Sequence, residues 1–106
     1  MANPFKQGFA MRKSKQQRKN LILKSFGEAV RNRRLDQKMT QEELGDAAQL
    51  HRTYITDIEN GLRNLSFLTM MRLATALQVP LSDLLVEAES NDGWHDDPQA
   101  LLKPKE

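Results

Sequence analysis

The 106-residue sequence contains no cysteine, which excludes a disulfide framework and a thiolate metal site. Aromatic residues are few (four Phe, one Tyr and one Trp), so the chain can build only one small hydrophobic core. No apolar run approaches the roughly 20 residues that a membrane-spanning helix needs, and no apolar signal-peptide segment follows the basic N-terminus. These absences predict one domain with tails and no membrane partner, and the lack of cysteine is compatible with the cytoplasmic location that we expect.

Groups for catalysis and metal binding are also lacking. The only histidines, His51 and His95, are far apart in the sequence and have no ligand cluster around them. There is no nucleophile–base pair, acidic dyad or phosphate-binding loop. We therefore expect neither an enzyme nor a bound metal or cofactor.

The charges are distributed unevenly. Residues 1–34 contain ten Lys or Arg and one acid, whereas residues 35–106 contain six Lys or Arg and thirteen Asp or Glu, so the net charge of +2 divides into +9 and −7. This asymmetry predicts a basic arm for nucleic acid at one end and an acidic, solvated tail at the other. We divide the chain into a basic N-terminal arm or helix extension (1–23), a folded domain (24–86) and an acidic tail (87–106).

The basic segment has three interpretations. Residues 1–20 form a disordered, solvated tail, or they form an arm that follows phosphates or enters a minor groove. In the third interpretation, residues 11–24 extend the first helix, because few helix breakers follow Gly8. The apolar residues Leu21, Ile22 and Leu23 would then be available for a dimer contact.

The strongest local pattern begins at Thr40. Thr40 and Glu43 have the spacing of a capping box, in which each side chain bonds to the backbone amide of the other residue. Leu44 and Ala48 then fall on one helical face. The pattern predicts a short helix over residues 41–48.

A second short helix is expected over residues 52–60. Ile55 and Ile58 face inward, and Gly61 ends the helix because glycine readily takes the left-handed conformation. The outward face carries side chains suited to base edges and phosphates. These side chains are Arg52, Thr53, Thr56, Asp57 and Asn60.

The run TQEELGDAAQLHRTYITDIENG resembles the helix-turn-helix of the lambda-repressor/Cro-type (Xre-like) DNA-binding family. The overlapping run HRTYITDIENGLRNLSF resembles restriction–modification controller proteins, a subgroup of that family. The resemblance implies an all-α, five-helix, lambda-repressor-like domain that binds double-stranded DNA as a homodimer. One departure is Gln49, which stands where most members have glycine with positive φ, at a cost of roughly 1 kcal/mol.

The resemblance and the outward side chains together predict the residues that contact DNA. They are Gln41, His51, Arg52, Thr53, Tyr54, Thr56, Asp57, Asn60, Arg63 and Asn64. Gln41 is expected to donate to a phosphate, and Arg52 to contact guanine through two hydrogen bonds. Asp57 repels phosphate, so it fits only if it accepts from cytosine or orients Arg52. Arg63 and Asn64 correspond to the loop residues that help to hold DNA in the controller proteins.

Three residues of this set keep alternative roles. His51 caps the second helix or contacts a phosphate. Thr53 contacts a thymine methyl group or a phosphate. Tyr54 packs on the scaffold with its hydroxyl on a phosphate, or it belongs to the edge of the core.

A buried ion pair is expected behind this surface. The first helix is predicted over residues 24–37, with Phe26 and Val30 facing the core. Arg34 lies one turn after Val30 on the same side, where an unpaired guanidinium is costly. The resemblance implies a glutamate partner late in the recognition helix, so we predict an Arg34–Glu59 salt bridge.

The last two helices are expected over residues 67–77, capped by Ser66, and over residues 81–86. Leu81 and Leu85 exceed what a small core can hold, and the family commonly dimerises through this region, so we predict a dimer interface there. Trp94, in the acidic tail, has no assigned role.

These patterns predict a sequence-specific transcriptional regulator that binds an inverted-repeat operator as a homodimer. The alternative is an antitoxin-like module. Its main partner would be a toxin protein bound through the tails, and its DNA binding would be autoregulatory.

Overall fold

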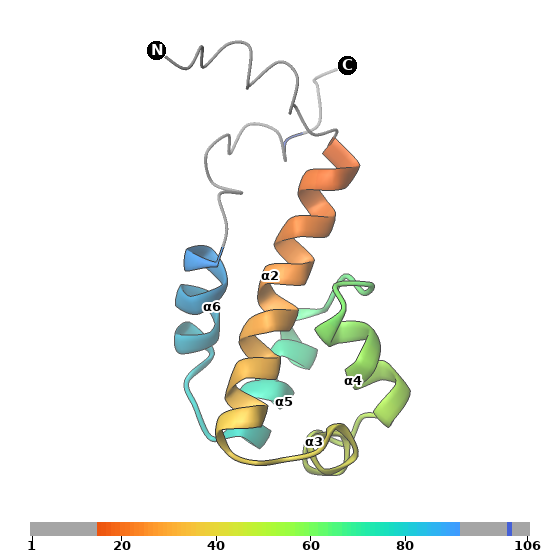
Figure 1. The fold of residues 1–106 in the computed structure, drawn as a ribbon, viewed down its shortest axis with the longest axis vertical. Coiled ribbons are helices and arrows are strands. Elements are labelled where there is room, and N and C mark those ends of the chain that lie inside the picture. Colours follow the sequence, from red (N-terminus) through yellow and green to blue (C-terminus); the bar gives the residue numbers. More distant parts are fainter. Residues whose placement is uncertain (1–14, 92–101, 103–106) are drawn as a thin grey trace.

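The computed structural model describes residues 15–91 and residue 102. This part of the chain forms five helices and no strand (Figure 1), which confirms the predicted all-α fold. The helices are α2 (Lys15–Asp36), α3 (Gln41–Ala48), α4 (Arg52–Glu59), α5 (Phe67–Leu77) and α6 (Leu81–Ser90). None of the described helices is long and apolar enough to cross a membrane.

The three middle helices begin at side-chain caps. The Thr40 hydroxyl accepts from the backbone N–H of Glu43 at 3.0 Å, and the Glu43 carboxylate accepts from the N–H of Thr40 at 2.8 Å. His51 accepts from the N–H of Thr53 through Nδ1 at 3.0 Å, and Ser66 caps α5 through the N–H of Thr69. Each cap satisfies a backbone donor that the first turn of a helix leaves free, so these residues determine where α3, α4 and α5 start.

The turns after α3 and α4 need left-handed backbone conformations. Gln49 has φ 60° and ψ 42°, the conformation expected at this position of the turn even though the residue is not glycine. Gly61 has φ 74°, as predicted, and a β-carbon there would lie 2.7 Å from the α-carbon of Lys24. Gly61 therefore provides both the backbone conformation and the room for α2 to pass the end of α4.

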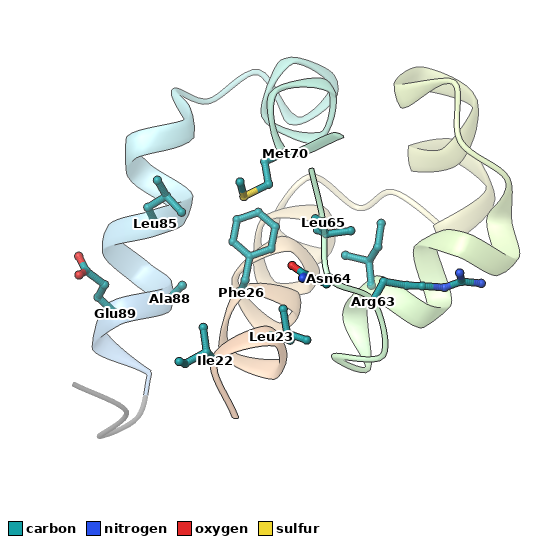
Figure 2. A pocket seen from close by; sticks show the side chains of 11 residues that line it. Ile22, Leu23, Phe26, Arg63, Asn64, Leu65, Met70, Leu85, Ala88 and Glu89 are labelled. Carbon is teal, nitrogen blue, oxygen red and sulfur yellow. The ribbon is translucent and has the colours of Figure 1, made fainter. Parts of the chain in front are cut away.

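The predicted start of the first helix at residue 24 is wrong, because α2 already begins at Lys15. The interpretation in which residues 11–24 extend the helix therefore holds from Lys15 onward, while residues 11–14 lie outside the described part. Ile22 and Leu23 explain the extension, since both are half-buried and line an apolar groove with residues of α6 (Figure 2). They continue the buried stripe of the helix toward its N-terminus.

The predicted end of the last helix near residue 86 is also wrong, because α6 continues to Ser90. Its last turns are held against α2. Ala88 is buried, and Glu87 accepts from Asn32 at 2.8 Å and from Arg33 at 3.2 Å. Beyond the helix, the Asn91 side chain donates to the backbone carbonyl of Ser25 at 3.1 Å.

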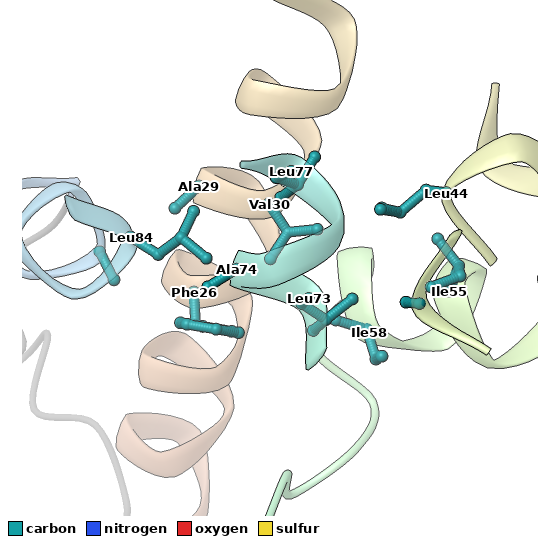
Figure 3. Close-up of a cluster of buried hydrophobic side chains, with 12 residues drawn as sticks. Phe26, Ala29, Val30, Leu44, Ile55, Ile58, Leu73, Ala74, Leu77 and Leu84 are labelled. Atoms are coloured by element: carbon teal, nitrogen blue, oxygen red, sulfur yellow. The ribbon is translucent and has the colours of Figure 1, made fainter. Parts of the chain in front are cut away.

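The hydrophobic core lies where all five helices meet. In Figure 3, α2 and α5 stand between α6 on one side and α3 and α4 on the other. Its members are Phe26, Ala29, Val30, Leu44, Ala48, Ile55, Ile58, Leu73, Ala74, Leu77, Leu84 and Ala88. Met39 and Leu50 pack against it from the loops before and after α3. The inner face of α4 supplies its core contacts, and the outer face is exposed at residues such as Arg52 and Thr53.

Candidate nucleic-acid interface

A buried ion pair fixes α4 to α2. Arg34 Nε lies 2.7 Å from Glu59 Oε2, and Arg34 Nη2 lies 3.0 Å from Glu59 Oε1. The third nitrogen, Nη1, donates to the backbone carbonyl of Met39 at 2.7 Å. The two side chains are 9% and 3% exposed, so the pair that the resemblance implied is present and is shielded from solvent. Two parallel hydrogen bonds give the contact a fixed geometry.

The same carboxylate holds α3 through Gln41. The Gln41 amide nitrogen donates to Glu59 Oε1 at 3.0 Å, and its oxygen accepts from the Thr56 hydroxyl at 2.8 Å. The amide therefore connects α3 to α4. From the sequence, only a phosphate contact was predicted for it. Its second N–H takes no part in this network and is available as a donor to an external acceptor. Thr56 is half-buried and its hydroxyl is engaged, which leaves its methyl group as the part suited to a base contact.

The first turn of α4 is the most open part of the predicted surface. His51, Arg52 and Thr53 are all exposed, and the Arg52 side chain makes no hydrogen bond or ion pair within the described residues. His51 is the cap, as one of its two interpretations had it, and the bond accepted by Nδ1 places the hydrogen of the neutral ring on Nε2. That nitrogen is available as a donor to an external acceptor.

Arg63, Asp57 and Tyr54 form a separate cluster along one side of α4. Arg63 Nε lies 3.1 Å from Asp57 Oδ2, and the Arg63 guanidinium lies 5.2 Å from the centre of the Tyr54 ring. The suggestion that Asp57 orients Arg52 is therefore wrong, because its partner is Arg63. Sequence reasoning missed this pair, although opposite charges on either side of the Gly61 turn were a visible signal. Asn60 and Asn64 are both exposed nearby.

The two leucines predicted at the dimer interface differ in their surroundings. Leu81 is half-buried and packs against the core, whereas the Leu85 residue is 40% exposed. Leu85 also lines the apolar groove between α2, α5, α6 and the loop after α4, a cavity of about 370 Å³ that sequence reasoning did not predict (Figure 2). Leu23, which had been considered for a dimer contact, lines the same groove and so contributes to its own domain.

Within residues 15–91, no three His, Asp or Glu side chains lie close enough together to hold a metal ion. Exposed donors and acceptors on a short helix, held from behind by a buried polar network, are therefore the chemistry that this face offers. Such groups suit contacts to phosphates and base edges.

Comparison with known proteins agrees with this geometry. The helix-turn-helix family matches residues 30–84. The control protein C.BamHI of Bacillus amyloliquefaciens is 46% identical over 67 residues, which are 62% of this chain and 83% of that protein. The transcriptional regulator ClgR of Mycobacterium tuberculosis is 34% identical over 68 residues, 64% of this chain and 61% of that protein.

Solved structures agree as well. The restriction–modification controller protein C.AhdI of Aeromonas hydrophila superposes with a TM-score of 0.57 at 35% identity, covering 59% of this chain and 94% of that one. The regulator ClgR of Corynebacterium glutamicum gives a TM-score of 0.63 at 28% identity, covering 65% and 90%. The chain belongs to the helix-turn-helix family. Its predicted resemblance to Xre-like regulators and to controller proteins is thereby confirmed.

Proposed function

We propose that this chain is a sequence-specific DNA-binding transcriptional regulator that binds an inverted-repeat operator as a homodimer. The observation that carries the proposal is the exposed first turn of α4, which the Arg34–Glu59–Gln41 network holds in a fixed position on α2 and α3. A side chain can read a base edge only if its helix is held rigidly relative to the DNA backbone, and this network provides that rigidity.

In the docking mode of the family, the N-terminal residues of α4 enter the major groove while the preceding helix crosses the backbone. Arg52 is then the residue best suited to a guanine, because it is exposed and has no partner within the described residues. The free N–H of Gln41 and the Nε2 of His51 are suited to phosphates on either side. Arg63 and Asn64 extend the contact beyond the C-terminal end of α4.

A dimer would place two copies of α4 in successive major grooves, about 34 Å apart on one face of the duplex. We assign the dimer contact to the exposed side of α6 around Leu85, by analogy with the family and because that leucine is only partly covered by its own domain. Relatives are control proteins and transcriptional regulators, which favours a regulator over the antitoxin-like alternative. Acting on genomic DNA implies a cytoplasmic location in a bacterial cell.

The proposal is tested by selection of genomic fragments with the purified full-length chain, followed by footprinting of the selected DNA. We expect protection of two half-sites related by an inverted repeat. Failure of the wild-type chain to bind any duplex at low salt would exclude this function, and protection of one isolated half-site would exclude the dimer.

A further inference from the structure

The Asp57–Arg63 pair connects α4 to the loop that follows it. Gly61 reverses the chain between the two residues, and the Arg63 guanidinium then returns over the Tyr54 ring. A carboxylate at one edge and an aromatic face below are two independent contacts on the same side chain. Arg63 is therefore held in one orientation, although it stands on an exposed loop.

The contacts leave the end of the guanidinium free. Only Nε donates to Asp57, at 3.1 Å, and neither terminal nitrogen of Arg63 donates to an acceptor within the described residues. The side chain of Arg63 is 52% exposed, compared with 25% for that of Asp57. Arg63 is one of the residues that line the apolar groove, and Figure 2 shows its side chain extending from there along α4.

A free arginine side chain carries about 2 kcal/mol of rotamer entropy that binding must remove. Holding Nε and the guanidinium plane beforehand removes part of that cost and leaves Nη1 and Nη2 to bond two oxygens of one phosphate. We propose that Asp57 and Tyr54 are positioning residues, which orient Arg63 so that its terminal nitrogens bind a DNA phosphate. This inference rests on the proposed function, and it assigns Asp57 a role other than reading a base.

Simple electrostatics predicts the opposite effect of Asp57. A carboxylate near the DNA repels phosphate, so neutralising it should raise the affinity of the protein for DNA. If Asp57 instead orients Arg63, neutralising it should lower that affinity. The sign of the change therefore distinguishes the two roles. Asp46 provides the matched control, because it is an exposed carboxylate on α3 with no ion pair among the described residues.

The test measures the Kd of the full-length chain for a short duplex of random sequence over a range of salt concentrations. We expect Asp57→Asn to weaken binding by a factor of about three, the size typical of a partly exposed charged pair. Asp46→Asn is expected to leave binding unchanged or to tighten it. Arg63→Ala should reduce the salt dependence by about 0.9 in slope, the value for removal of one phosphate contact.

Further variants separate positioning from charge. In an Arg63→Lys background, Asp57→Asn should no longer weaken binding, because lysine has no Nε to be held while its end binds phosphate. Tyr54→Phe keeps the ring beneath the guanidinium and Tyr54→Leu removes it, so Tyr54→Leu should bind DNA more weakly than Tyr54→Phe does. Urea unfolding of each variant checks that the fold is retained.

Tighter binding by Asp57→Asn, or an equal loss in the presence and absence of Arg63, would overturn the inference. Equal binding by Tyr54→Leu and Tyr54→Phe would overturn the role given to the ring. These results differ from failure of the proposed function itself, in which the wild-type chain would bind no duplex at low salt.

Discussion

At the scale of single residues, Glu59 has the widest effect, because its two oxygens serve both α2 and α3. Arg34 uses both of them, and Gln41 shares one. Burying two charges is costly, and the cost is offset only while each remains paired and hydrogen-bonded. Loss of either partner would therefore leave an uncompensated charge at the junction that positions α4.

Replacing Arg34 with methionine is expected to lower the free energy of unfolding by about 3–5 kcal/mol, the range for breaking one side of a buried pair. Urea denaturation measures the change. Arg33→Met is the matched control on the same helix, because the Arg33–Glu87 pair is 32% and 22% exposed and such pairs contribute about 0–1 kcal/mol. Equal losses in the two variants would show that burial does not distinguish the pairs.

Arg52 is expected to determine base preference. Arg52→Ala should lower the discrimination between the operator and a duplex in which another base replaces the contacted guanine. The expected loss is about 1–3 kcal/mol, because the variant cannot form the bidentate hydrogen bonds. Competition binding with single-base variants of the operator measures this difference. Arg72→Ala, which removes an exposed arginine of α5, is the control for net charge. If Arg52→Ala weakens every duplex equally, its contact is to a phosphate.

At the scale of elements, the sequence predicted the helices whose ends are determined locally. Thr40, His51 and Ser66 are caps whose chemistry is visible in neighbouring residues, so the starts of α3, α4 and α5 were correct. The first turns of α2 and the last turns of α6 depend on packing between these two helices. The lack of helix breakers made the N-terminal extension one of three interpretations, but only the packing of residues such as Leu23 and Ala88 decides where the two helices end. The Asp57–Arg63 pair was missed although its opposite charges are visible in the sequence, because the contact depends on the path of the chain through Gly61.

The crossing of α2 and α4 also depends on a contact that sequence reasoning did not identify. A β-carbon at Gly27 would lie 2.2 Å from the backbone oxygen of Ile58 and 2.8 Å from that of Glu59. Both neighbours are backbone atoms of α4, so they cannot move without shifting the helix that carries the candidate interface. This position therefore couples core packing to the placement of the candidate interface.

Gly27→Ala is expected to destabilise the domain by about 1–3 kcal/mol, the usual cost of overpacking, even though alanine favours helix formation. Thermal unfolding checks this, with Arg31→Ala as an exposed control on α2. The substitution should also weaken operator binding by any variant that remains folded, because α4 must shift. A stabilised Gly27→Ala protein would contradict the close approach of the two helices.

At the scale of the whole molecule, charge and association decide how the chain meets DNA. Ten of its sixteen Lys and Arg residues lie within residues 1–34. Residues 1–14 precede α2, so they can be removed without cutting into that helix. If this segment follows phosphates, its deletion should make the salt dependence of binding shallower by about 0.9 for each phosphate that it neutralises. An unchanged slope would show that residues 1–14 do not bind phosphates.

The dimer prediction must be tested with Leu85 rather than Leu81. Leu81 packs against its own core, so a charge there would disturb folding as well as association. Leu85 is 40% exposed, and Leu85→Glu should therefore leave the monomer folded while placing a charge in the interface. We expect the variant to sediment as a monomer and to lose tight binding to the inverted repeat. Leu35→Glu is the control, since Leu35 is 49% exposed on α2. A Leu85→Glu protein that stays dimeric would place the interface on a different surface from this side of α6.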